Sequence, residues 1–252
     1  MPITEALLVA GAAGPLGAAV LETALGTAHW APVIALTTQP IDVALRGLQV
    51  LQMPGVPAAL PTFGAAAPAT ALIVFDRERS LHGREAAFMR PLPDELPRFA
   101  AWLRDAGVRR LMVVMPHAPA LLPQALKAGL ASLDEQAVAA LHFEQLVIVR
   151  PTRAAGPASA GHSRLQALAN GLLAQLHWMV PQRDQPLRAV KVAEFVIELA
   201  RLLPGAPAGT RVVPPELLWD WAQPDGGDRL LRDWLRHGER PDAPMTRPAQ
   251  RW

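Results

Sequence analysis

Three regularly spaced glycines follow the first apolar segment of the chain. Gly11, Gly14 and Gly17 form the pattern G-x-x-G-x-x-G between an apolar run at 5–10 and a segment at 15–25 with helical spacing. Glycines let an anion approach the backbone closely, and the first turn of a helix supplies N–H groups and a partial positive charge. The pattern therefore predicts a loop that holds the diphosphate of a dinucleotide. The residues expected to contact it are Gly11, Ala13, Gly14, Pro15, Leu16 and Gly17.

Strand-like and helix-like segments alternate over most of the chain. Strands are predicted at 5–10, 32–37, 47–51, 70–75, 108–115, 146–150 and 209–213. Helices are predicted at 15–25, 94–106, 121–141, 163–178, 190–203, 215–221 and 228–237. This order is typical of an α/β fold with a doubly wound parallel sheet of the Rossmann type, here with a small C-terminal extension. Such glycines also occur in plain tight turns, but the strand before them and the helix after them favour a dinucleotide loop.

The end of the second predicted strand bears on the choice of dinucleotide. An acidic residue at this place binds the ribose 2′-hydroxyl of NAD and repels the 2′-phosphate of NADP. Here Thr37, Thr38 and Gln39 can donate hydrogen bonds to a phosphate, and the first acid is Asp42. No arginine stands at the turn itself, although Arg46 follows several residues later. NADP is therefore favoured as the cofactor, with NAD as the alternative.

Composition excludes several kinds of chemistry. The 252 residues include no cysteine and no tyrosine, which rules out disulfides, thiolate ligands and a phenolic catalyst. The net charge is +2 with scattered arginines, and the histidines lack metal-ligand spacing, so neither a nucleic acid nor a metal is expected. No apolar run reaches the roughly 20 residues that span a bilayer, and the first residues lack the positive charge of a secretion signal. We therefore expect a cytoplasmic protein without a membrane partner.

Polarity changes near the C-terminus. Residues 1–222 are predicted to form one dinucleotide-binding domain with a small C-terminal lobe, and residues 223–252 a polar tail that includes the predicted helix 228–237. The aromatic content near this polar region is high, with tryptophans at Trp219, Trp221 and Trp234. Core packing explains Trp219 or Trp221, and a docking surface explains the others.

Five segments resemble the atypical short-chain dehydrogenase/reductase family, which includes NmrA-like proteins and relatives of nucleoside-diphosphate-sugar epimerases. The most specific are 9–17, with its three glycines, and 143–152, which reads Phe-Glu-Gln-Leu-Val-Ile-Val-Arg-Pro-Thr. Segments 83–88, 106–114 and 186–194 are similar in apolar pattern and order. The matches lie between residues 5 and 215. The resemblance implies a Rossmann-type fold that binds NAD or NADP.

The family's catalytic residues are missing from this chain. The resemblance implies a serine at the end of the fifth strand and a Tyr-x-x-x-Lys motif on the next helix, which performs acid–base chemistry. Met115 or Pro116 stands where the serine is expected. One alignment places Lys127 at the tyrosine and Ala131 at the lysine, and a shifted one places Pro123 at the tyrosine and Lys127 at the lysine. Catalysis by a phenol therefore cannot occur here.

Other residues near the strand ends are candidates for the site. His117 can transfer protons near neutral pH or cap a turn between two prolines, and the turn is favoured. Lys127 can contact a ribose or phosphate, or be a solvated helix lysine. Asp76 and Glu78 can meet a substrate, or form a solvated loop with neighbouring arginines, which is favoured. Because they end strands, four residues are expected to contact the cofactor: Phe75, Asp76, Met115 and Pro151.

Three functions are consistent with these features, and the first two are favoured over the third. The first is an NAD(P)-dependent oxidoreductase or epimerase relative that acts on a small molecule with a replaced catalytic acid. The second is a non-catalytic dinucleotide sensor or assembly factor with a protein partner, as the resemblance to NmrA-like members implies. A third is a relative that has lost the cofactor as well. Either a monomer or a homodimer agrees with the family.

Overall fold

Seven strands form the centre of the computed structural model, which describes residues 5–41, 45–53, 67–76, 86–115, 132–151, 188–224 and 226–238. The strands are β1 (Glu5–Ala10), β2 (Trp30–Thr37), β3 (Leu48–Gln52), β4 (Thr70–Val74), β5 (Arg110–Val114), β6 (Gln145–Val149) and β7 (Gly209–Val213). Their order across the sheet is β3-β2-β1-β4-β5-β6-β7, and all neighbouring pairs are parallel. The predicted α/β fold with a parallel, doubly wound sheet is confirmed.

The direction of the strand order reverses beside β1. This strand pairs with β2 on one side and with β4 on the other. In open parallel sheets, ligands bind outside the carboxyl ends of the strands at such a switch point. Gly11 follows β1 and Phe75 follows β4, so the glycine segment lies at the switch point of this sheet.

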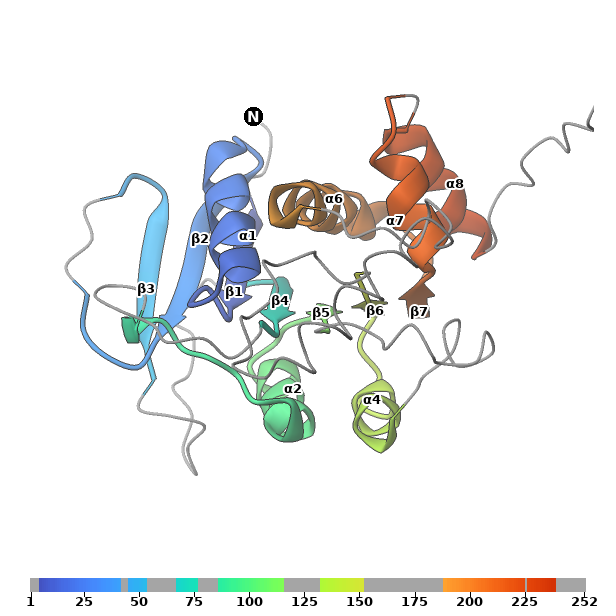
Figure 1. Ribbon diagram of the computed structural model, residues 1–252. Helices are drawn as coiled ribbons and strands as arrows, with labels where there is room; N and C mark the ends of the chain where they lie inside the picture. The colour runs from blue at the N-terminus through green and yellow to red at the C-terminus, as the bar shows by residue number, and fades with distance from the viewer. Residues whose placement is uncertain are drawn as a thin grey trace, which may run out of the picture.

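Helices cover both faces of the sheet (Figure 1). One face packs against α1 (Pro15–Gly26), α6 (Ala189–Leu202), α7 (Pro215–Trp221) and α8 (Asp228–His237). The other face packs against α2 (Leu96–Asp105) and α4 (Leu133–Ala139). Two short 3₁₀ helices, η2 (Pro93–Glu95) and η5 (Leu203–Gly205), adjoin α2 and α6.

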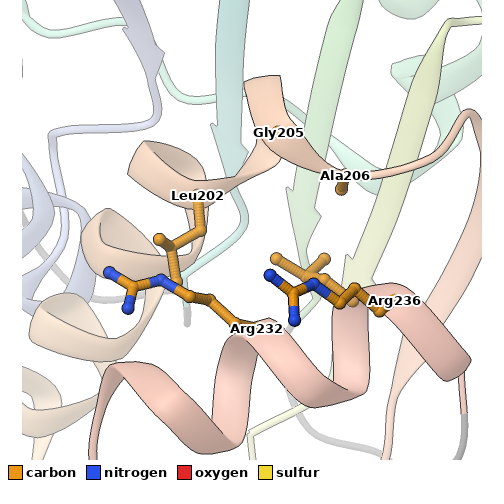
Figure 2. A pocket seen from close by; sticks show the side chains of 6 residues that line it. Leu202, Gly205, Ala206, Arg232 and Arg236 are labelled. Atoms are coloured by element: carbon orange, nitrogen blue, oxygen red, sulfur yellow. The ribbon is translucent and has the colours of Figure 1, made fainter.

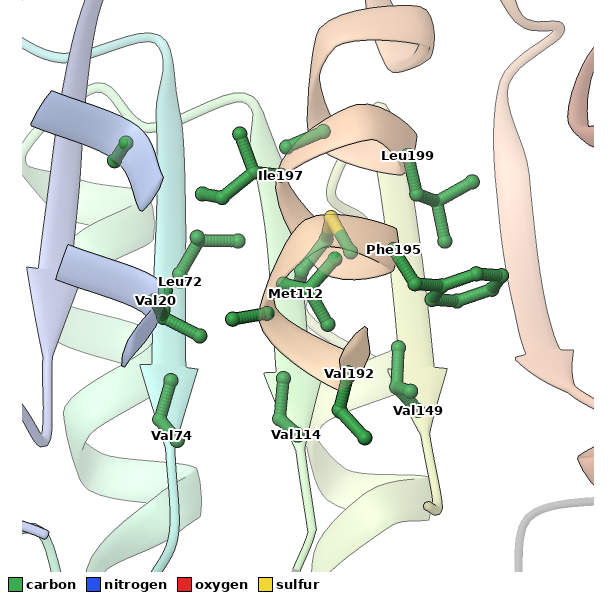
Figure 3. Packing of buried hydrophobic residues seen from close by; sticks show 14 of the residues in the cluster. Val20, Leu72, Val74, Met112, Val114, Val149, Val192, Phe195, Ile197 and Leu199 are labelled. Atoms are coloured by element: carbon green, nitrogen blue, oxygen red, sulfur yellow. The ribbon is translucent and has the colours of Figure 1, made fainter. Parts of the chain in front are cut away.

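Successive residues of a strand enter different hydrophobic clusters because side chains alternate between the faces of a sheet. In β4, Leu72 and Val74 belong to the cluster under α1 and α6 (Figure 3). Ile73 belongs to the cluster under α2 and α4. On α6, Val192, Phe195, Val196 and Leu199 repeat at helical spacing and are all buried. Burying a side chain of this size contributes about 1.5–3 kcal/mol, so this face holds α6 on the sheet.

Helix α8 is part of the core although most of its residues are polar. Leu231, Trp234 and Leu235 are at most 2% exposed and belong to the cluster under α1 and α6, whereas the Arg229 side chain is 96% exposed. The predicted helix at 228–237 is confirmed. The interpretation of Trp234 as part of a docking surface is wrong, because its ring is buried between helices.

The predicted elements agree with the structure to within two residues wherever it describes them. The strand predicted at 32–37 begins two residues earlier, and the helix predicted at 94–106 is divided between η2 and α2. Gly107 ends that helix with a φ of 95°, as a glycine C-cap does. Of the helix predicted at 121–141, α4 covers the final part, and residues 116–131 lie outside the described ones. The helix predicted at 163–178 lies wholly outside them.

Candidate functional site

Gly11 and Gly17 let three backbone segments approach closely at the end of β1. Gly11 has a φ of 96°, a conformation that side chains disfavour. A β-carbon on Gly11 would lie 1.9 Å from the carbonyl oxygen of Val74 in β4. One on Gly17 would lie 1.8 Å from the carbonyl oxygen of Gly11. The glycines therefore fit the roles expected of a Rossmann-type loop, with a tight turn after the strand and a helix packed against it.

Gly14 and Pro15 begin helix α1. Gly14 is the N-cap residue in an extended conformation, and Pro15 occupies the first turn, where its missing N–H has no partner within a helix. No acidic residue stands in this first turn. The positive end of α1 therefore adjoins the loop without a neutralising group from the helix itself.

The Asp76 carboxylate supplies an anion at this helix end from elsewhere in the chain. Its Oδ2 accepts a hydrogen bond from the Leu16 N–H at 2.7 Å and a longer one from the Gly17 N–H at 3.4 Å. A β-carbon on Gly14 would lie 2.3 Å from the same oxygen. The structure thus brings together the predicted site residues Gly14, Leu16, Gly17 and Asp76.

The alternation of β4 explains why Asp76 reaches the loop. Leu72 and Val74 face α1, so the next residue of the same parity, Asp76, emerges on the same side. Phe75 has the opposite parity: its side chain is 2% exposed and lies in the cluster under α2 and α4. The predicted contact residue Phe75 therefore does not present its ring to the glycine loop.

Further N–H groups of the loop, among them those of Ala13 and Gly14, have no acceptor within the described part of the chain. Ala13 and Gly14 are buried, and their N–H groups donate to no described residue. Buried backbone donors without a partner are rare in folded proteins. These two groups can therefore donate to an anion that approaches the loop.

The carboxyl end of β2 is paired with a segment from after β4. Thr37 forms an antiparallel bridge with Phe88. The Thr38 N–H and hydroxyl both donate to the carbonyl oxygen of Ala87, at 2.8 and 3.3 Å. The Thr37 hydroxyl is buried without a hydrogen-bond partner among the described residues. Neither of the two predicted hydroxyl donors is presented to a ligand in this arrangement.

Met115 and Pro151 lie at the same edge of the sheet, after β5 and β6. The Met115 N–H donates to the Val149 carbonyl oxygen at 2.9 Å, and Pro151 is buried. Both positions agree with the expectation that they end strands at the carboxyl edge.

A buried ion pair at this edge was missed by the sequence analysis. Arg150, directly after β6, pairs with Glu135 in the first turn of α4, with 2.5 Å between Nη2 and Oε2. The two side chains are 4% and 3% exposed. An arginine that directly follows a buried strand needs an anionic partner, and the acidic residues at 134 and 135 were the signal for it. The pair ties the start of α4 to the end of β6.

The catalytic candidates His117 and Lys127 lie outside the described residues, as do Asp42, Glu78 and Pro116. In the part of the chain that is described, no group of His, Cys, Asp and Glu residues has the arrangement of a metal site. The helices described there are too short or too polar to cross a bilayer. The site that can be built from the structure is therefore the glycine loop with Asp76.

A hollow of about 220 Å³ lies between the end of α6 and α8 (Figure 2). Arg232 and Arg236 project toward it from α8, but Arg232 pairs with Asp228 at 3.2 Å. Asp228 also pairs with Arg201 of α6 at 2.6 Å. A hydrogen bond from Arg201 to Glu198 is the main cause that raises the pKa of Arg201. These charges join α6 to α8, and no residue of the glycine loop lines the hollow.

Three solved structures are similar to this chain at low identity. The Bordetella bronchiseptica enzyme WbmG in complex with NAD has a TM-score of 0.43 and 16% identity, over 89% of this chain and 82% of that one. A protein from Burkholderia pseudomallei has a TM-score of 0.34 and 16% identity, over 58% and 72%. The protein gox2253 has a TM-score of 0.36 and 14% identity, over 86% and 79%. No protein-family model matches the chain, and no curated protein is significantly similar.

Proposed function

We propose that this chain is a nicotinamide-dinucleotide-binding protein of the short-chain dehydrogenase/reductase type, with residues 11–17 as the diphosphate loop. The observation that carries the proposal is the loop itself. It follows β1 at the switch point of a parallel sheet, it opens α1, and at Gly11 and Gly17 it leaves no room for a β-carbon. This combination suits close approach of a diphosphate to backbone N–H groups.

The residues around the loop fit a dinucleotide in part. The N–H groups of Ala13 and Gly14 have no described acceptor, which suits a phosphate. The N–H groups of Leu16 and Gly17 are already bonded to Asp76, so a phosphate can use them only after that carboxylate moves. We therefore propose binding that begins from a loop closed by Asp76.

NADP is the favoured dinucleotide in this proposal. No acid stands among the described residues 37–41, so nothing there repels a 2′-phosphate. Because Thr37 is buried and Thr38 is bonded to Ala87, the preference rests on the absence of repulsion rather than on the threonine hydroxyls. NAD remains the alternative cofactor.

The chemical role has two candidates. A bound nicotinamide supplies hydride chemistry, so the first is an oxidoreductase or epimerase relative, with His117 or Lys127 as candidates for the missing acid. The absence of tyrosine favours the second, a non-catalytic protein that senses the dinucleotide and acts on a protein partner. Both act in the cytoplasm in our proposal.

Calorimetric titration of the full chain with NADP⁺, NADPH, NAD⁺ and NADH tests the binding proposal. We expect binding, tightest for the NADP pair, and absence of binding at millimolar concentrations would contradict it. Oxidation of NADPH is then measured with a panel of aldehydes, ketones and quinones. Turnover that is lost in His117→Ala supports the enzyme, whereas binding without turnover supports the sensor.

A further inference from the structure

We propose that the Asp76 carboxylate is an internal anion that occupies the place of the dinucleotide's phosphate at the start of α1, so that a dinucleotide binds by displacing it. This inference rests on the proposed function. It concerns the same loop but adds a residue that opposes binding. The sequence predicts that Asp76 contacts the cofactor, meets a substrate or lies in a solvated loop, and our proposal gives it another role, as a competitor for the phosphate's donors.

The hydrogen bonds of Asp76 are those that a phosphate needs. Helix N-termini bind phosphates through the N–H groups of the first turn and the partial positive charge of the helix end. Asp76 Oδ2 already accepts from the first two such groups after Pro15, those of Leu16 and Gly17. A carboxylate and a phosphate are both anionic acceptors, so they compete for the same donors.

The space above Gly14 is also filled by Asp76. A β-carbon on Gly14 would lie 2.3, 2.4 and 2.5 Å from the Oδ2, Cγ and Cβ atoms of Asp76. In a dinucleotide loop, the second glycine leaves room for the diphosphate to approach the backbone. Here the whole Asp76 side chain, from its base to its carboxylate, lies where that room is. A diphosphate and this rotamer of Asp76 therefore exclude each other by volume as well as by charge.

The fold determines the position of Asp76 beside the glycine loop. Asp76 is two residues beyond Val74, whose carbonyl oxygen lies against Gly11, so its backbone is adjacent to the loop. The parity of β4 directs its side chain toward α1. A side-chain rotation or a shift at the end of β4 moves the carboxylate away from the loop. The sheet itself can stay unchanged.

Exchange of one anion for another has a measurable consequence. The free protein loses hydrogen bonds to a charged acceptor when a dinucleotide enters, and this loss weakens the apparent affinity. Hydrogen bonds to a charged group are strong enough that their removal changes an equilibrium about 10- to 100-fold. Removing the carboxylate should therefore strengthen dinucleotide binding by about 10-fold or more.

The test compares the full-length chain with Asp76→Asn and Asp76→Ala by calorimetric titration with NADPH and NADH. Asp76→Asn retains the size of the side chain and removes its charge, while Asp76→Ala also removes most of its volume. Asp134→Asn is the matched control. Asp134 is an exposed acid in the first turn of α4, so this substitution removes one negative charge away from the glycine loop. Thermal unfolding without nucleotide provides a second measurement.

We expect both Asp76 variants to bind about 10-fold or more tightly than the parent, to unfold at a lower temperature without nucleotide, and Asp134→Asn to match the parent. Binding that is unchanged or weaker in both Asp76 variants overturns the inference and leaves the proposed function standing. Absence of binding in the parent and in both variants overturns the proposed function itself. Binding that only the variants show supports both.

Discussion

The Asp76 carboxylate lies 2.7 Å from the backbone nitrogen of Leu16, sixty residues earlier in the chain. This hydrogen bond connects the end of β4 to the first turn of α1 at the switch point of the sheet. It gives the glycine loop an anionic partner from the protein's own chain. The Asp76 carboxylate accepts from the N–H groups of Leu16 and Gly17, the donors for which, in our proposal, a dinucleotide competes.

Gly17 and Gly26 stand on the same helix and provide a matched pair of substitutions. Gly17→Ala brings a methyl group to 1.8 Å from the Gly11 carbonyl oxygen, whereas a β-carbon on Gly26 meets nothing within 4 Å. We expect Gly17→Ala to lower the free energy of unfolding by about 3 kcal/mol. Gly26→Ala should leave it unchanged or raise it by up to about 1 kcal/mol. Urea denaturation measures both, and equal stabilities would contradict the close packing of the loop.

A substitution at Gly14 tests whether the glycine loop binds the dinucleotide. In Gly14→Val the new side chain enters the space that Asp76 fills and a diphosphate would need. We expect dinucleotide binding to be lost and the free energy of unfolding to fall by about 1–3 kcal/mol, so that the fold persists. Gly205→Ala is the control, because a β-carbon there meets no atom within 4 Å. Undiminished affinity of Gly14→Val in calorimetry would show that the loop is not the site.

The pair of Arg150 and Glu135 should be important for stability. Removing one partner leaves the other charge buried, so Arg150→Ala and Glu135→Ala should each lower the free energy of unfolding by about 3–5 kcal/mol. The double variant Arg150→Met/Glu135→Gln should lose much less, because it removes both buried charges together. The exposed pair of Arg109 and Glu144, 3.6 Å apart, is the comparison, and Arg109→Ala should change stability by under about 1 kcal/mol.

Helix α8 should behave as part of the domain. Trp234 is 2% exposed, and Trp234→Ala should lower the free energy of unfolding by about 3–5 kcal/mol, since it leaves a large cavity. Arg229→Ala, on the exposed side of the same helix, should change it by less than about 0.5 kcal/mol. Denaturation followed by circular dichroism separates the two. Similar values for both variants would place α8 outside the cooperative core.

Local patterns were sufficient to predict most of the described elements. The central strands are short, largely apolar runs, and β6 reads Gln-Leu-Val-Ile-Val with every residue buried. The loop was predicted because its three glycines are close in sequence. The helix at 228–237 was predicted from the spacing of its apolar residues. Its burial was not predicted, because most of its residues are polar. Leu231, Trp234 and Leu235 form a narrow apolar stripe that only the packing on α6 explains.

Contacts between distant segments could not be predicted in the same way. The position of Asp76 against Leu16 depends on how β4 lies beside β1, although the alternation in β4 indicates which face Asp76 shares. The bridge of Thr37 to Phe88 pairs a strand end with a segment that has no strand pattern of its own. Because this bridge has no signal in the sequence, both threonine hydroxyls were expected to meet a phosphate. In the structure, Thr37 is buried and the Thr38 hydroxyl donates to Ala87.

The response of the loop's backbone amides to a dinucleotide tests most directly whether residues 11–17 bind it. A ¹H–¹⁵N correlation spectrum of the full chain, recorded during titration with NADPH, reports each amide separately. We expect saturable shifts for Ala13, Gly14, Leu16 and Gly17 that exceed those of the amides in α8. Saturable binding that leaves these four amides unshifted, or a spectrum unchanged at millimolar NADPH, would contradict this expectation.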